Sequence, residues 1–315
     1  MKKFSLAALL LFVSLTLGAQ HTVNSFFDEI GAIRSESQEL NLNSDTLPFV
    51  FSRTDDVVWS RVVYRVIDLR YRQNFQLYFP VNPEDKEYKN MFRLILDAII
   101  DGMPVYAVVD NQVKPDFSPE SRILPSQLTT ILMYSEIGKD YSEIENHYDM
   151  QTSDEMLIHY DSVSGKMSFH SYQFKDFVKN QFKYLIQEVI YFDKHTCTLN
   201  RKLMAIAPMY APNISSVEPG QEEQALLEQR LFWIAYDHLR PYLAKQYLIP
   251  QINETKRVTY EEFFQKRLYT SYIIGEDNMY DRMILDYCHT EKEAKQEQAR
   301  MENELLTFEQ DLWEY

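Results

Sequence analysis

Glycine and cysteine are scarce in this sequence, and their scarcity narrows the chemistry open to it. Only 7 of the 315 residues are glycine and only 2 are cysteine. The phosphate-binding patterns G-x-x-x-x-G-K-[ST] and G-x-G-x-x-G, which need closely spaced glycines, are both missing. The metalloprotease pattern H-E-x-x-H and the hydrolase pattern G-x-S-x-G are missing as well. The sequence therefore predicts no catalytic, cofactor or metal residue, and we expect a protein that is not an enzyme.

The two cysteines, Cys197 and Cys288, leave two alternatives open. They form one disulfide in an oxidising compartment, or they remain two free buried thiols. Each has a histidine close by, His195 and His289. Neither pair has the spacer that zinc ligands usually show, so a zinc site from these four residues is not predicted.

Basic residues are fewer than acidic ones. Lysine and arginine total 32 against 47 aspartates and glutamates, a formal net charge of −15. Nucleic acid and anionic lipid surfaces are poor partners for such a chain, whereas a basic protein surface is compatible with it. The chain is also 45% hydrophobic and 14% aromatic, which allows a sizeable core.

Long hydrophobic runs are absent except at the N-terminus. There Lys2 and Lys3 precede an apolar run at 4–17, and small residues follow at Gly18 and Ala19. This pattern is typical of a secretory signal peptide, and the run is too short for a comfortable membrane span. We expect a signal peptide at 1–19, a flexible polar arm at 20–53, and a mature chain outside the cytoplasm with no membrane span of its own. A retained membrane anchor is the alternative.

The stretch from 55 to 73 combines helical and strand-like features. Thr54 suits a helix cap, and Trp59, Val62, Val63 and Val66 recur at helical spacing. The β-branched residues favour a strand instead. We expect a helix from 55 to 73.

A helical projection of this stretch separates its charges from its apolar side. Arg61, Arg65, Asp68 and Arg72 fall opposite the apolar side, as a solvated face or as a docking ridge for an acidic surface. Arg70 alone projects from the apolar side. It either reaches solvent or a carboxylate of its own chain, or it pairs across a protein interface.

The remainder of the chain reads as a mixture of helices and antiparallel hairpins. Patterns predict an extended piece at 75–80, a helix ending at Gly102, a strand at 103–109 and a short helix at 126–137. Two apolar runs, 183–193 and 199–209, predict a β-hairpin. Residues 231–243 are strand-like at first and helical after His238, and Thr259 with Glu262 has capping-box spacing. Without a regular βαβ rhythm, the expected fold class is α+β, with a globular domain at 54–289.

The last segment, 290–315, is predicted to be an acidic amphipathic helix. Met301, Leu305, Phe308 and Leu312 form an apolar stripe along it. The stripe either packs back onto its own domain or inserts into a groove of a partner.

Four blocks of the sequence carry recognisable motifs. The stretch "VVWSRVVYRVIDLRYRQNFQLYFP" resembles the signature W-S-x-x-x-x-R-x-I-D-L-R-E-K-x-N…L-Y-(Y/F)-P of the GldN/PorN family of gliding-motility proteins, although Tyr71-Arg72 stands where the family has E-K. The matching positions are Trp59, Ser60, Arg65, Ile67, Asp68, Leu69, Arg70, Asn74, Leu77, Tyr78 and Pro80. Blocks beginning at Ile186, Leu231 and Thr259 are similar to later family segments.

The resemblance implies a non-enzymatic periplasmic structural subunit of the type IX secretion and gliding-motility machinery of Bacteroidetes. It implies a ring of many copies formed with a GldK/PorK-like outer-membrane lipoprotein, which holds the protein at the inner face of the outer membrane. A GldM/PorM-like motor protein is the second implied partner. The rival classes are a secreted hydrolase of cell-envelope glycans, which would need two carboxylates placed together in space, and a monomeric ligand-binding protein.

The interface expected from these patterns combines the charged stretch and the C-terminal stripe. Its residues are Arg61, Arg65, Asp68, Arg70, Arg72, Met301, Leu305, Phe308 and Leu312.

Overall fold

The centre of the molecule is an antiparallel sheet of six strands. The computed structural model describes residues 46–47, 52–82, 88–108, 113–132, 157–161, 164–169, 174, 177–178, 183–210, 229–250, 257–280 and 282–312. The strand order is β6-β5-β4-β1-β8, and β7 pairs with β5. The strands are β1 Val57–Asp68, β4 Lys183–Asp193, β5 Thr198–Tyr210, β6 Gln229–Arg230, β7 Ile234–Ala235 and β8 Ser271–Glu276. A separate hairpin joins β2 Ile158–Asp161 to β3 Lys166–Phe169.

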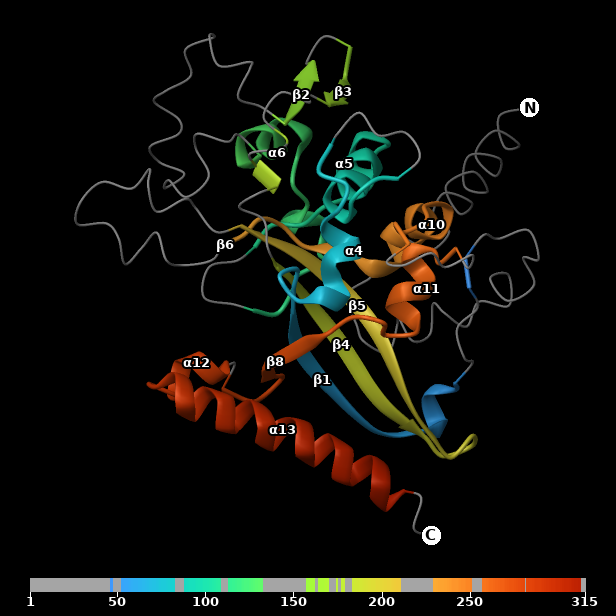
Figure 1. Cartoon of the computed structure of the whole chain (residues 1–315), viewed down its shortest axis with the longest axis vertical. Coiled ribbons are helices and arrows are strands. Elements are labelled where there is room, and N and C mark those ends of the chain that lie inside the picture. The colour runs from blue at the N-terminus through green and yellow to red at the C-terminus, as the bar shows by residue number, and fades with distance from the viewer. Residues whose placement is uncertain are drawn as a thin grey trace, which may run out of the picture.

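Helices lie at both ends of the sheet, as Figure 1 shows. The helices are α4 Phe75–Tyr78, α5 Met91–Ile100, α6 Pro125–Ile131, α10 Tyr236–Lys245, α11 Tyr260–Gln265, α12 Ile284–Tyr287 and α13 Glu291–Asp311. Short 3-10 turns occur at η1 Thr54–Asp56, η2 Arg72–Asn74 and η3 Pro119–Ser121. Helices and antiparallel strands without a βαβ rhythm make the fold α+β, as expected.

The helix predicted at 55–73 is wrong, because residues 57–68 form strand β1. This strand pairs with β4 along its whole length and with β8 at residues 63–67. Both of its faces are covered in the second half, so apolar residues occur on both sides and mimic helical spacing. The β-branched content was the better indicator.

The predicted hairpin of 183–193 and 199–209 is confirmed as β4 and β5. A register shift between Gln187 and Glu188 marks a bulge in their pairing. The helix ending at Gly102 is also confirmed as α5, where Asn90 caps the N-terminus and Gly102 has a φ of 99°. Thr259 caps α11 through the backbone of Glu262, as its spacing indicated.

Other boundaries differ from the expectation. Residues 75–78 form the short helix α4 rather than an extended piece, and Tyr106 makes only isolated bridges within 103–108. The helix predicted at 126–137 is seen as α6, Pro125–Ile131, and residues 133–137 lie outside the described part of the chain. Helix α10 begins two residues before His238.

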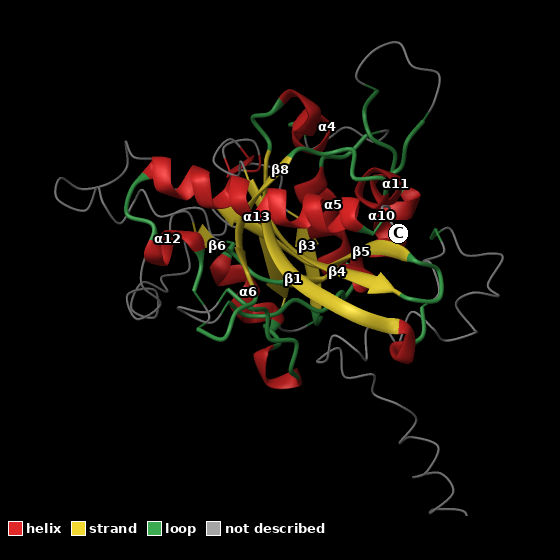
Figure 2. Cartoon of the chain, turned by 90° about the horizontal axis from the view of Figure 1, so that it is seen from below, coloured by secondary structure: helices red, strands yellow, loops and turns green. Residues whose placement is uncertain are grey.

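The main apolar core lies between the upper half of the sheet and α4, α5, α10 and α11. Ile67, Ile95, Ile186, Phe232 and Leu239 are among its fully buried side chains. A smaller core lies between the lower half of the sheet and α13. Figure 2, seen from below, shows α13 lying across the sheet next to β1.

Candidate functional site

Arg61 and Arg65 lie on the face of β1 that α13 covers. The Arg61 guanidinium lies 3.2 Å from a carboxylate oxygen of Glu276 and 3.5 Å from one of Glu304 on α13. Arg65 is buried; its Nε lies 3.2 Å from Glu188 on β4, and its Nη1 lies 3.2 Å from Glu302 on α13. Both arginines therefore join the sheet to the C-terminal helix.

Glu188 is the centre of a buried charged cluster that sequence reasoning missed. Besides Arg65, its carboxylate accepts hydrogen bonds from Arg267 at 3.1 Å and from the Tyr269 hydroxyl at 2.6 Å. Burial and the neighbouring carboxylate raise the pKa of Tyr269 well above its usual value. Both guanidiniums and the hydroxyl converge on one carboxylate, so the cluster ties β1 and β4 to the segment between α11 and β8.

Arg70 does not project from an apolar face, which corrects the expectation based on a helix. Its side chain is 65% exposed just after the end of β1, and its Nη2 lies 2.5 Å from Asp68. Burial alone would raise the pKa of Asp68, but the side-chain and backbone hydrogen bonds from Arg70 outweigh burial and lower it. Arg70 thus meets a carboxylate of its own chain, one of the two alternatives.

The expected basic ridge of Arg61, Arg65 and Arg72 is not continuous. Arg61 and Arg65 face α13, whereas Arg72 is exposed in η2 beyond the end of the strand. The ridge was predicted from helical geometry, and it does not form because residues 57–68 are a strand.

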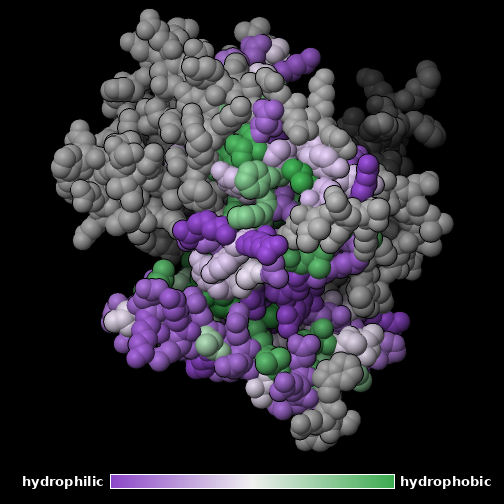
Figure 3. Space-filling model, in the orientation of Figure 1, coloured by the Kyte–Doolittle hydropathy of each residue, from purple (hydrophilic) through white to green (hydrophobic). Residues whose placement is uncertain are grey.

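The C-terminal stripe packs on its own domain, the first of the two alternatives. Met301 and Leu305 are buried against Val63, Ile190 and Ile273. The Phe308 ring stacks on Trp59 with centroids 4.4 Å apart, and Leu312 is half-buried at the helix end. Of the two alternatives for this stripe, the structure shows the packed one. Figure 3 shows mainly hydrophilic side chains on the outer side of α13, at the bottom of the molecule.

A second buried pair ties the start of the described chain to the helices. The Glu261 carboxylate accepts hydrogen bonds from Arg240 at 2.7 Å and from the Leu47 backbone N–H at 3.0 Å. Arg240 also donates to the Leu47 carbonyl. Arg240 and Glu261 belong to two different resemblance blocks, and nothing in the sequence paired them.

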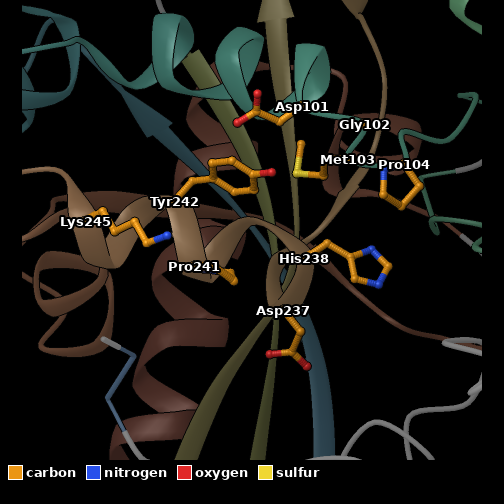
Figure 4. Close-up of a pocket in the computed structure, with 9 residues that line it drawn as sticks. All are labelled: Asp101, Gly102, Met103, Pro104, Asp237, His238, Pro241, Tyr242 and Lys245. Carbon is orange, nitrogen blue, oxygen red and sulfur yellow. The ribbon is translucent and has the colours of Figure 1, made fainter. Parts of the chain in front are cut away.

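A pocket of about 540 Å³ lies between the end of α5 and α10. In Figure 4, Tyr242 lies below Asp101, whereas the imidazole of His238 points to the Pro104 side and Asp237 points away below it. Burial lowers the pKa of His238, and burial together with Asp101 raises the pKa of Tyr242. The two carboxylates do not converge, so the pocket lacks the paired acids that glycoside hydrolysis requires.

The remaining features of interest are possible metal ligands, the two cysteines and membrane-spanning helices, all within the part of the chain that the structure describes. Within it, no group of three histidine, cysteine or acidic side chains could hold a metal ion. Cys197 and Cys288 are free thiols, Cys197 exposed and Cys288 half-buried. No helix in these ranges is long and apolar enough to cross a membrane. The expected signal peptide at 1–19 and most of the arm at 20–53 lie outside the described residues.

Comparison with known proteins places these elements in one family. A search of the curated proteins gives no match. The family model described as gliding motility associated protein GldN matches residues 52–314, from just before β1 to beyond the end of α13. Because this match covers most of the chain, the protein belongs to the GldN family of gliding motility associated proteins.

Proposed function

We propose that this protein is a non-enzymatic structural subunit of the type IX secretion and gliding-motility machinery in the periplasm. In this proposal many copies form a ring with a GldK/PorK-like outer-membrane lipoprotein, and the ring contacts a GldM/PorM-like motor protein. The observation that carries the proposal is the family match over residues 52–314.

The use of charged residues within the fold supports a structural role. Arg65 and Arg267 both pair with Glu188 inside the molecule, and Arg240 pairs with Glu261. These are among the more deeply buried ion pairs of the described chain, and the two pairs at Glu188 join elements far apart in the sequence. Such pairs make a rigid subunit, which suits a part that bears load between neighbours.

An exposed apolar stretch after β8 supports a binding role. Met279 is 88% exposed and Leu285 is 76% exposed, and Tyr280 and Tyr287 beside them are exposed too. Large apolar side chains gathered in one exposed place commonly mark contacts between proteins. The exposed side chains of Met279, Tyr280, Leu285 and Tyr287 are therefore the surface we assign to the lipoprotein or to the next copy.

The acidic composition and the expected signal peptide fit the proposed location. A chain with a net charge of −15 is a poor partner for anionic lipid, so a lipoprotein partner would supply the attachment to the outer membrane.

Co-expression with the GldK/PorK-like lipoprotein tests the proposal. We expect ring-shaped particles by electron microscopy and a complex of both proteins by native mass spectrometry. A protein that remains monomeric beside the lipoprotein contradicts the proposal.

A pair of variants locates the contact. Met279→Ser combined with Leu285→Ser should keep the fold and lose the lipoprotein on co-purification, because both side chains are exposed. Leu124→Ser, at an exposed site near η3 and α6, is the matched control and should retain the lipoprotein.

A further inference from the structure

Leu47 is held by its main chain rather than by its side chain. Its N–H donates to Oε2 of Glu261 at 3.0 Å, and its carbonyl accepts a hydrogen bond from Nη2 of Arg240. The Leu47 residue is 37% exposed. In Figure 1 the short blue piece of chain that contains Leu47 lies beside α10 and α11, the helices that carry Arg240 and Glu261. The contact therefore recognises main-chain groups, and the leucine side chain contributes little to it.

The two charged side chains act as one unit. Arg240 donates to Oε1 of Glu261 from Nε at 2.9 Å and from Nη2 at 2.7 Å. Oε2 of Glu261 then accepts from the N–H of Leu47, and Nη2 of Arg240 reaches its carbonyl. In an antiparallel pair of strands, one residue uses its N–H and its C=O to bond the C=O and N–H of the residue opposite. The ion pair takes the place of that opposite residue, with an acceptor and a donor side by side.

Burial of the carboxylate creates the need for an N–H at this place. Glu261 is 0% exposed, and burial together with its carboxylate raises the pKa of the neighbouring Tyr236. Arg240 satisfies one oxygen of Glu261, so the other oxygen needs a second donor, because an unpaired buried charge is costly. Asp237, whose carboxylate lies 3.8 Å from Nη1 of Arg240, is a further acceptor and cannot supply that donor. The N–H of Leu47 supplies it.

We propose that Arg240 and Glu261 form a binding site for the main chain of an extended peptide segment, which the protein fills with its own segment at Leu47. The site has the hydrogen-bond chemistry of strand addition, with two side chains in place of a sheet edge. The bound segment is exchangeable: the same segment, supplied as a separate peptide, binds when the chain's own copy cannot. This inference goes beyond the proposed function and does not depend on the ring.

A variant that releases its own segment tests the proposal on the full mature chain. Leu47→Pro removes the N–H and places a ring carbon against Glu261, so the site is vacated while Arg240 and Glu261 stay unchanged. The probe is a fluorescein-labelled peptide with the sequence of residues 44–50, S-D-T-L-P-F-V. By fluorescence anisotropy it should bind Leu47→Pro at least about tenfold more tightly than the wild type, whose own segment competes. No binding to Leu47→Pro, or equal binding to both proteins, overturns the proposal.

Two modified peptides separate main-chain recognition from apolar attraction. The first has N-methyl-leucine at the position of Leu47, so it keeps the side chain and lacks the N–H. It should bind the Leu47→Pro protein at least about tenfold more weakly, because one oxygen of Glu261 stays unpaired. The second has alanine at that position, keeps both main-chain groups and should bind as the unmodified peptide does. Binding that N-methylation leaves unchanged, or equal losses with both peptides, overturns the proposal.

Two adjacent glutamates of α11 locate the site. In the Leu47→Pro protein, Glu261→Gln should weaken peptide binding at least about tenfold, because an amide has one acceptor oxygen where the carboxylate has two. Glu262→Gln is the matched control and should bind as its parent does, since the Glu262 carboxylate pairs with Lys266. Melting curves show whether each variant is folded. Equal peptide affinities of the two folded variants overturn the proposal.

Hydrogen exchange on the wild type keeps the proposal testable if a variant fails to fold. The Leu47 N–H should exchange at least about tenfold more slowly in the protein than in the free peptide, because it is bonded to a buried carboxylate. Exchange at the rate of the free peptide overturns the proposal. The same protection in dilute and concentrated protein supports binding of the chain's own segment. Protection only where sedimentation shows association would assign the site to the segment of a second copy and overturn the proposal.

Discussion

At the scale of residues, the buried carboxylate of Glu188 determines the role of Arg65. A carboxylate that is 3% exposed must be paired and hydrogen-bonded, and Arg65, Arg267 and Tyr269 provide this. Arg65 therefore serves the fold, although its place in the signature suggested a surface. Arg61, four residues earlier on the same face, pairs nearer to solvent.

Arg65→Ala should lower the free energy of unfolding by about 3 kcal/mol, because it removes one of the two cations that pair with the buried Glu188. Arg61→Ala is the matched control on the same strand face and should cost less than about 1 kcal/mol, since its pairs are partly exposed. Urea denaturation of both variants measures the difference. Equal losses of unfolding free energy in the two variants would contradict the stabilising role of the pair between Arg65 and Glu188.

Asp68 should make stability depend on pH in the acid range. Its folded pKa lies below its usual value, so its contribution is complete above the unfolded pKa of about 3.9 and is lost as pH falls through the folded pKa. Asp68→Asn should thus be less stable than the wild type at pH 6. Below about pH 4, near the pKa of an aspartate in the unfolded chain, its stability should fall less steeply than that of the wild type. Thermal melts from pH 6 to pH 3 measure this; parallel curves for the two proteins would refute it.

At the scale of elements, local signals were reliable where contacts are local. The φ of Gly102 and the cap at Thr259 involve neighbouring residues, and α5 ends and α11 begins as the sequence indicates. Strand β1 was mistaken for a helix because its partners, β4 and β8, lie more than a hundred residues away. Periodicity cannot separate a strand covered on both faces from a helix.

The attachment of α13 can be tested with two adjacent leucines. Leu305 is 4% exposed against the sheet, whereas Leu306 is 51% exposed on the same helix. Leu305→Ala should lower the free energy of unfolding by about 3 kcal/mol through lost burial and a cavity. Leu306→Ala should change it by less than about 0.5 kcal/mol. Chemical denaturation gives both values, and similar losses would show that α13 is not packed as described.

At the scale of the whole molecule, the candidate site joins segments that no sequence pattern links. Arg65 on β1, Glu188 on β4, Arg267 after α11 and Glu302 on α13 meet at one place. Only the tertiary pairing brings them together, so sequence reasoning found the arginine and missed its partners. The apolar stripe of α13 was predictable, since it follows from helical spacing alone.

Removal of residues 291–315 should destabilise the whole domain rather than leave it intact. Met301 and Leu305 cover Val63, Ile190 and Ile273, and Arg65 and Arg201 would lose Glu302 and Glu309. We expect a lower melting temperature and association of the truncated chain through the uncovered face. Calorimetry and light scattering check both, with a chain ending at 312 as the control. A truncated protein that melts like the control would contradict this account.

The position of α13 in the chain also determines when one face of the sheet can be covered. During synthesis from the N-terminus, β1 is made before α13, so the face with Trp59 and Val63 stays uncovered until α13 has been made. Any pause or early stop before α13 leaves that face open to other molecules. A chain that lacks α13 therefore cannot cover this face of its own sheet.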